Sequence, residues 1–129
     1  HHLLRRQRQM CIRDSSHANK LYRMDGLSIP EAAEALLSHF PLDSFIPHPI
    51  ERMEIDGKPD EINEVHQDLI DTVKKVSGDN WKIGSIERQK FYVEAKKTMA
   101  VITTSDTRPY GCFMFTKGVL KPDGSVWII

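Results

Sequence analysis

Residues 99–116 read MAVITTSDTRPYGCFMFT, two apolar stretches joined by a polar loop. The run 99–102 has no charged side chain, which is typical of a strand buried on both faces of a sheet. Beyond the loop, Phe113 and Phe115 lie two residues apart and so share one face of a second strand over 110–116. This pair of strands makes a sheet the centre of the expected fold.

Two helices are expected before these strands. Ser28 and Glu31 have the spacing of a capping box, and apolar residues recur at helical intervals over 28–40. A second helix is expected over 59–77, where Pro59 suits a first turn and Gly78 suits a helix terminator. Its apolar stripe consists of Ile62, Val65, Leu69, Val73 and Val76.

Further strands are expected over 50–55, 81–86, 91–95 and 126–129, the third because Phe91, Val93 and Ala95 alternate with polar residues. One long bent strand through 91–102 remains an alternative. Helices followed by consecutive strands predict an α+β fold. We expect two amphipathic helices packed on a mostly antiparallel sheet of four to five strands. The apolar ending of the chain predicts a fold truncated at its C-terminus.

The first 14 residues are expected to be foreign to the domain. Arg5 to Asp14 read RRQRQMCIRD, which resembles the in-frame translation of a transposase sequencing adapter. Segments of this kind are set aside before fold reasoning. The expected organisation is therefore a non-native leader over 1–14, a disordered or linker segment over 15–27, and a single partial α+β domain over 28–129.

Charge and cysteine content exclude several classes of protein. Without residues 1–14, which carry four Arg and one Asp, the chain has 14 basic and 17 acidic residues. Lys90, Lys96 and Lys97 could form a basic strand face with Tyr92, but the mildly acidic balance and the single well-placed aromatic argue against a nucleic-acid partner. No apolar run is long enough to span a membrane, so no membrane partner is expected. One cysteine remains, Cys112, which favours a reducing, cytoplasmic or intracellular setting.

A short segment carries the one resemblance to a known family. Residues 27–36, LSIPEAAEAL, are similar to the first helix of helix-turn-helix DNA-binding domains of the excisionase kind. The resemblance implies DNA binding, but Pro41 and the prolines that follow leave no room for a recognition helix. No base-reading residue is therefore assigned.

The loop 103–110 is the candidate ligand site. It gathers hydroxyl groups, one acid, one guanidinium and one phenol between two strands, and such groups bind phosphate or carboxylate. The candidate ligand-binding residues are Thr104, Asp106, Arg108 and Tyr110. The competing interpretation is a solvated hairpin loop built from ordinary turn residues. We expect Arg108→Ala to change stability by no more than about 0.5 kcal/mol, and a loss of several kcal/mol would make Arg108 a buried structural partner and rule out the site.

No catalytic, metal or cofactor motif is recognised. His66 projects near the edge of an apolar stripe, which favours a partly buried structural histidine over a metal ligand. Cys112 lies in a strand, where a buried inert thiol is expected. We therefore interpret the chain as a non-catalytic binding or assembly domain of unknown ligand and partner, from an environmental microbial or viral gene fragment. The alternative is a fragment of an enzyme that binds an anionic substrate through the 103–110 loop.

Overall fold

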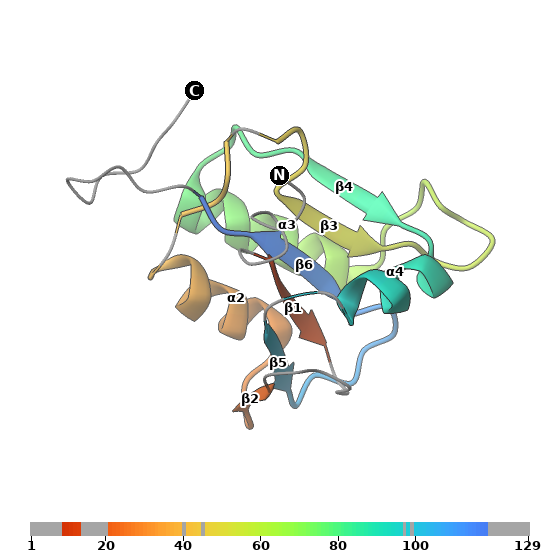
Figure 1. Ribbon diagram of the computed structural model, residues 1–129, viewed down its shortest axis with the longest axis horizontal. Coiled ribbons are helices and arrows are strands. Elements are labelled where there is room, and N and C mark those ends of the chain that lie inside the picture. Colours follow the sequence, from red (N-terminus) through yellow and green to blue (C-terminus); the bar gives the residue numbers. More distant parts are fainter. Residues whose placement is uncertain are drawn as a thin grey trace.

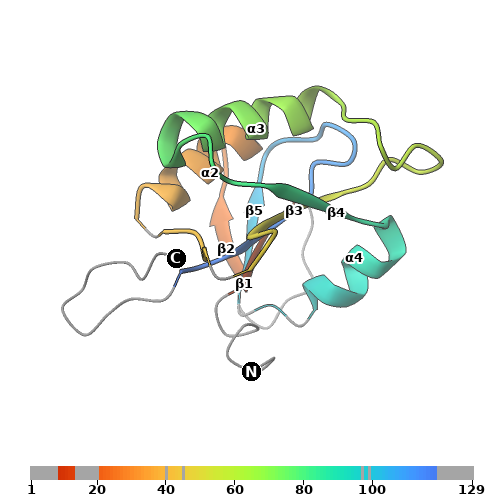
Figure 2. The same ribbon diagram turned by 90° about the horizontal axis from the view of Figure 1, so that it is seen from above.

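A mixed β-sheet lies between two layers of helix in the computed structural model, which describes residues 9–13, 21–39, 41–44, 46–96, 98 and 100–118. Helices α2 (Ile29–Leu37) and α3 (Glu64–Ser77) cover one face of the sheet, and α4 (Arg88–Ala95) covers the other (Figure 2). The expected α+β class is confirmed in this coarse form. The third helix, α4, corrects the expectation of two helices.

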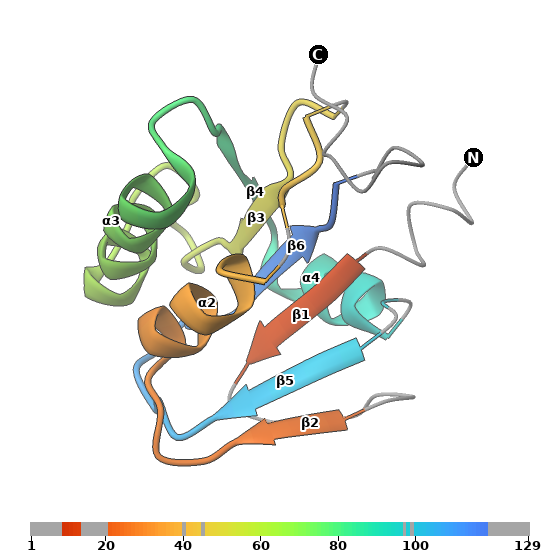
Figure 3. The same ribbon diagram turned by 90° about the vertical axis from the view of Figure 1, so that its left-hand side faces the viewer.

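Six strands form the sheet in the described part of the chain, in the order β2-β5-β1-β6-β3-β4 (Figure 1, Figure 3). Their bounds are β1 Gln9–Arg13, β2 Leu21–Met24, β3 Ile50–Met53, β4 Ile83–Ile86, β5 Ala100–Thr104 and β6 Phe113–Thr116. Strand β6 pairs antiparallel with β1 and β3, whereas the pairs β1–β5, β2–β5 and β3–β4 are parallel. The expected mostly antiparallel sheet is therefore wrong. A helix carries the chain from β3 to β4, and such a crossover returns it in the parallel direction.

The sheet separates two apolar cores. Phe113 and Phe115 of β6 face α2 and α3, whereas Met114 faces α4. Strand β5 divides in the same way, because Val101 packs towards α4 and Ile102 packs towards α2 and α3. Both residues are buried, which confirms the expected two-sided burial of this strand. The alternation follows from the two-residue period of an extended chain.

Helix α2 follows its sequence signal closely, and α3 begins later than expected. The backbone N–H of Glu31 donates to the Ser28 hydroxyl, and the Ser28 N–H donates to the Glu31 carboxylate, which completes the capping box. Helix α3 begins after Asn63 rather than at Pro59, because the Asn63 side chain accepts a hydrogen bond from the His66 N–H at 3.2 Å. A side-chain cap of this kind satisfies a donor that the helix itself leaves free.

The expected strand over 91–95 is wrong, because residues 88–95 form helix α4. The Glu87 carboxylate accepts hydrogen bonds from the N–H groups of Gln89 and Lys90 and so starts the helix. Phe91 and Ala95 are buried and lie four residues apart, whereas Val93 is 54% exposed. The alternation of Phe91, Val93 and Ala95 predicted a strand, but only Phe91 and Ala95 are buried, at the i, i+4 spacing of a helix.

Strands β1 and β2 correct the expected domain boundary at residue 28. Strand β1 lies between β5 and β6 and carries the fully buried Ile12, although it falls within the segment taken as a leader. Strand β2 falls within the segment taken as a linker and forms one edge of the sheet. The foreign origin of residues 1–14 remains a prediction. The strand expected over 126–129 lies outside the described residues.

Candidate functional site

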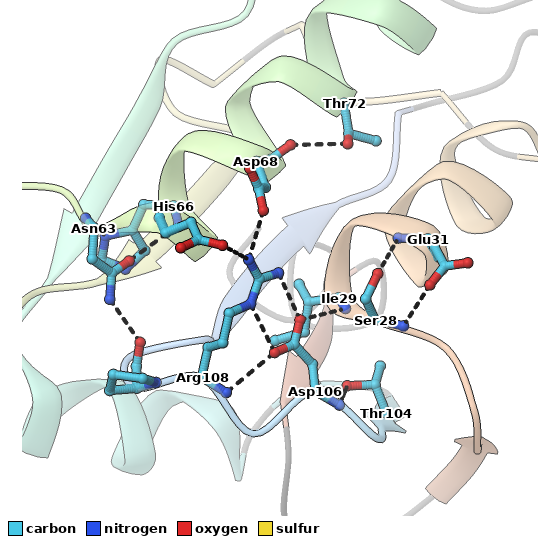
Figure 4. Close-up of polar contacts among 12 residues, drawn as sticks. Ser28, Ile29, Glu31, Asn63, His66, Asp68, Thr72, Thr104, Asp106 and Arg108 are labelled. Atoms are coloured by element: carbon cyan, nitrogen blue, oxygen red, sulfur yellow. Dashed lines mark hydrogen bonds and ion pairs between the residues drawn. The ribbon is translucent and has the colours of Figure 1, made fainter.

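A buried carboxylate organises the loop that follows β5. The side chain of Asp106 is 4% exposed and accepts a hydrogen bond from the backbone N–H of Ile29, at the start of α2, at 3.0 Å. It also accepts from the backbone N–H of Arg108 and from two nitrogens of the Arg108 guanidinium, at 2.9 and 3.0 Å (Figure 4). The Arg108 side chain is the largest cause that lowers the pKa of Asp106 to about 2. The Thr104 hydroxyl accepts from the Asp106 N–H at 3.2 Å.

Arg108 links this loop to α3. Its Nη1 donates to the Asp68 carboxylate at 2.6 Å and to the Glu64 carboxylate at 3.2 Å. The hydrogen bonds that Arg108 donates to Asp106, and then to Asp68, raise the pKa of Arg108 above its ordinary value. Because three protein carboxylates engage this guanidinium, it is poorly placed to take up a free anion. The same contacts argue against the expectation that Arg108→Ala leaves stability unchanged.

Tyr110 is the strained residue of the loop. Its φ of 59° lies in the left-handed region, and it is the non-glycine residue with positive φ among the described residues. This conformation costs about 1–3 kcal/mol and persists where the surroundings enforce it, often at functional sites. The Tyr110 carbonyl oxygen lies 3.0 Å from Nε2 of His66, and the Pro109 carbonyl accepts from Asn63 Nδ2 at 2.7 Å.

The Tyr110 side chain lines a pocket on the α4 face of the sheet, here called the tyrosine pocket. Its volume is about 330 Å³, at the lower end of the range for small-molecule sites. The lining residues are Met53, Asp56, Arg88, Tyr92, Thr107, Arg108, Pro109, Tyr110, Gly111 and Cys112. The pocket therefore lies between the end of β3, helix α4 and residues 107–112, three separate segments of the chain.

An ion pair and two phenols give the tyrosine pocket its chemistry. Arg88 Nε donates to the Asp56 carboxylate at 2.8 Å. This hydrogen bond is the first cause that raises the pKa of Arg88, and Tyr92 and Tyr110 also contribute through their charges. Both phenols therefore lie within electrostatic reach of the guanidinium. The carboxylate and the two phenols can exchange protons with a polyhydroxylated ligand, and the guanidinium can donate hydrogen bonds to it.

The structure separates the four residues proposed from the sequence. Thr104, Asp106 and Arg108 share one hydrogen-bond network that ties the loop to α2 and α3. Tyr110 contributes its side chain to the tyrosine pocket, and Arg108 also reaches the pocket lining. Thr104, Asp106 and Arg108 thus hold the loop in place, and Tyr110 lines the tyrosine pocket.

Sequence reasoning missed Asp56, Arg88 and Tyr92. No motif in the sequence singles out Asp56 for a ligand pocket, and the other two lie on helix α4, most of which was expected to be a strand. The spacing of Arg88 and Tyr92, four residues apart, places them on one side of a helix and would have been the available signal.

The two single residues expected to be buried are buried, and His66, for which partial burial was expected, is more buried than predicted. His66 is fully buried and both of its ring nitrogens are hydrogen-bonded to protein groups. Cys112 is 5% exposed, and it packs in the core between the sheet and α4 at the wall of the tyrosine pocket. Within the described ranges, no cluster of three His, Cys, Asp or Glu side chains is arranged to hold a metal ion. No helix among the same residues has the length and apolar character needed to cross a bilayer.

Comparison with known proteins gives consistent matches. The RbsD / FucU transport protein family matches residues 9–120. The human protein named fucose mutarotase is 35% identical over 100 residues, which are 76% of this chain and 65% of the human protein. The chain thus spans just under two thirds of that relative's length.

Solved structures agree with this assignment. A Streptococcus pneumoniae fucose mutarotase, crystallised in complex with L-fucose, matches with a TM-score of 0.78 and 28% identity, over 93% of this chain and 90% of that one. FucU from Bifidobacterium longum matches with a TM-score of 0.76 and 28% identity, over 89% of this chain and 86% of that one.

These matches overturn the functional interpretation of the sequence. A non-catalytic binding or assembly domain of unknown ligand is wrong, because the matching relatives are named fucose mutarotases. The alternative, an anion site in the 103–110 loop, also fails, since Arg108 is already engaged by Asp106, Asp68 and Glu64. The similarity of residues 27–36 to a DNA-binding helix reflects only a well-capped amphipathic helix, α2. Since the family match extends over most of the sequence, the chain belongs to the RbsD / FucU transport protein family.

Proposed function

We propose that this chain is a sugar mutarotase that interconverts the α and β anomers of a fucose-like monosaccharide in the tyrosine pocket. Relatives that share about a third of its residues are named fucose mutarotases, and one similar structure holds L-fucose. The observation that carries the proposal is the convergence of Asp56, Tyr92 and Tyr110 on one pocket of monosaccharide size.

The chemistry requires only proton transfer. The anomeric hydroxyl loses its proton, the bond between the anomeric carbon and the ring oxygen breaks, and the ring oxygen gains a proton. The open aldehyde rotates about its bond to the next carbon, and the reverse steps close the ring on the other face. A positioned base and a positioned acid accelerate such steps by about 10²- to 10⁴-fold. The reaction balances without a redox partner or cofactor.

The residues of the pocket fit these two roles. The Asp56 carboxylate, held in place by Arg88, is suited to accept the anomeric proton. The Tyr110 phenol is suited to donate a proton to the ring oxygen, and Tyr92 supplies a second hydroxyl on the same side of the sheet. Met53, which is 2% exposed, offers an apolar surface for the non-polar side of the sugar.

The four loop residues predicted from the sequence have different roles in this proposal. Tyr110 lines the pocket proposed for the sugar, and Arg108 borders it with its guanidinium engaged by Asp106, Asp68 and Glu64. Thr104 and Asp106 act indirectly, because they hold the loop through the Asp106 carboxylate and its partners.

Anomer exchange measured by NMR tests the proposal. The wild-type chain, added to equilibrated L-fucose, should transfer saturation between the two anomeric proton signals faster than buffer does. Tyr110→Phe and Asp56→Asn should each lower the catalysed rate by about 10²-fold or more, since each removes an acid or base. Tyr22→Phe is the matched control, because Tyr22 is 54% exposed on the edge strand β2, outside the pocket lining. Wild-type protein that binds L-fucose without accelerating exchange would rule out the enzyme.

A further inference from the structure

The backbone of Tyr110 needs a holding contact. A φ of 59° is energetically unfavourable for tyrosine. If no contact held the loop, Tyr110 would adopt a negative φ. The neighbours leave little room for that movement. Gly111 has Ile29 Cδ1 only 2.7 Å from the place where a Cβ would be, and Pro109 is tied to Asn63. The direction of the Tyr110 side chain therefore depends on what fixes its own peptide.

His66 makes that contact from the first turn of α3. Its ring is fully buried and packs edge-to-face on Phe113, with centroids 5.7 Å apart. Nδ1 lies 3.3 Å from the backbone nitrogen of Asn63, whose N–H is a donor, so Nδ1 accepts. The remaining proton of the neutral ring is then on Nε2, which donates to the Tyr110 carbonyl oxygen at 3.0 Å. Both ring nitrogens thus have assigned roles.

The surroundings keep this ring neutral. Burial is the largest cause that lowers the pKa of His66, and the charge of Arg52 lowers it further. Arg52 and the Met53 backbone face the ring from β3, Phe113 faces it from β6, and the loop presents the Tyr110 backbone. A protonated ring would lose the acceptor for the Asn63 N–H and gain a repulsive contact with Arg52.

We propose that His66 is a positioning residue for the sugar reaction, because its Nε2–H fixes the peptide of Tyr110 and so aims the phenol into the tyrosine pocket. The bond holds the carbonyl, and the carbonyl direction sets ψ of Tyr110. With φ at 59°, ψ determines where the Cα–Cβ bond points. His66 lies on the face of the sheet opposite the pocket and need not touch the sugar. The catalytic part of this inference rests on the proposed function.

Two variants that replace the ring with an amide, His66→Gln and His66→Asn, distinguish the positioning of Tyr110 from the capping of α3. In His66→Gln, the amide nitrogen can reach the place of Nε2 and still donate to the Tyr110 carbonyl, but the acceptor for Asn63 is lost. In His66→Asn, the amide oxygen can replace Nδ1 and keep the cap, but the donor to Tyr110 is lost. Both variants remove the ring from its contact with Phe113, and His66→Asn also loses the packing of one more methylene, so kcat is compared with KM and with the Tyr110 ring signal.

The kinetic expectation follows from this division. His66→Gln should keep kcat within about threefold of wild type, and His66→Asn should lose about 10- to 100-fold in kcat with little change in KM, since displacements near 1 Å have effects of that order. Equal activity in the two variants, or a larger loss in His66→Gln, would overturn the proposal, because either result would make the donor to Tyr110 irrelevant.

A spectroscopic readout keeps this test separate from the proposed function. In protein carrying ¹³C-labelled tyrosine, the Tyr110 ring signal is assigned by its absence in Tyr110→Phe. This signal should stay near its wild-type position in His66→Gln and shift in His66→Asn. If wild-type protein does not accelerate anomer exchange, the mutarotase proposal fails. The ring signal still decides whether His66 positions Tyr110, and an unshifted signal in His66→Asn would refute it.

Discussion

Replacing Asp106 by Asn should destabilise the fold by an amount that depends on pH. The variant keeps the size of the side chain and removes the charge that holds Arg108 and caps the start of α2. The pKa of Asp106 is lowered from 3.8 to about 2 in the folded chain, chiefly by Arg108. A difference of this size corresponds to about 2 kcal/mol of stability at pH 7. The carboxylate is nearly fully buried, so solvent screening removes little of this amount.

The sign of the pH dependence follows from the lowered pKa. Between the folded and unfolded pKa values the unfolded chain binds more protons, so acid favours unfolding in that window. The contribution of Asp106 is fully present above about pH 4. It falls below about 0.5 kcal/mol near pH 2, where the carboxyl of the folded chain is itself half protonated. The gap between wild type and Asp106→Asn should close over the same range.

Urea unfolding followed by circular dichroism, at pH values from 7 down to 2, measures this gap. Asp25→Asn is the matched control, because Asp25 forms an ion pair with Arg23 in which both side chains are about two thirds exposed or more. That variant should stay within about 0.5 kcal/mol of wild type at every pH. An Asp106→Asn gap below about 0.5 kcal/mol at pH 7, or a gap of constant size down to pH 2, would refute the electrostatic account.

The remaining predictions concern packing and use the same urea assay. Phe91→Ala should cost about 3–5 kcal/mol and Val93→Ala less than about 0.5, because α4 buries the first and exposes the second; equal losses would favour a strand here. Gly118→Ala should cost about 1–3 kcal/mol, since a Cβ would lie 2.7 Å from the Leu42 carbonyl oxygen; a neutral change would show that this approach relaxes freely. Arg52→Met should be neutral or stabilising, because Arg52 is buried with Nη1 unpartnered among the described residues; a loss above about 2 kcal/mol would contradict this.

The elements that were predicted correctly are those whose sequence signals lie within the element itself. The capping box at Ser28 and Glu31 and the apolar period of α2 are signals within one helix, and both appear in the structure. The same holds for β5 and β6, whose apolar runs match their burial. Each of these signals depends on residues within about four positions in the sequence, so it can be read without knowing the tertiary structure.

Elements decided by distant partners were mispredicted. Strands β1 and β2 are short, and they are held by parallel pairing with β5, about 80–90 residues away in the chain. Helix α4 has few apolar residues, and its geometry becomes evident only where Phe91 and Ala95 meet the sheet. The parallel direction of β3 and β4 likewise depends on the path of the chain through α3.

The sequence by itself determined the α+β class, the cap of α2 and the burial of His66. Only the tertiary structure decided the sheet order, the role of Asp106 and Arg108 as internal supports, and the meeting of Asp56, Arg88 and Tyr92 with Tyr110. The physical reason is one of range. Helical and strand periods arise from steric and hydrogen-bond preferences of adjacent residues, whereas a pocket forms where distant segments are brought together by burial of their apolar faces.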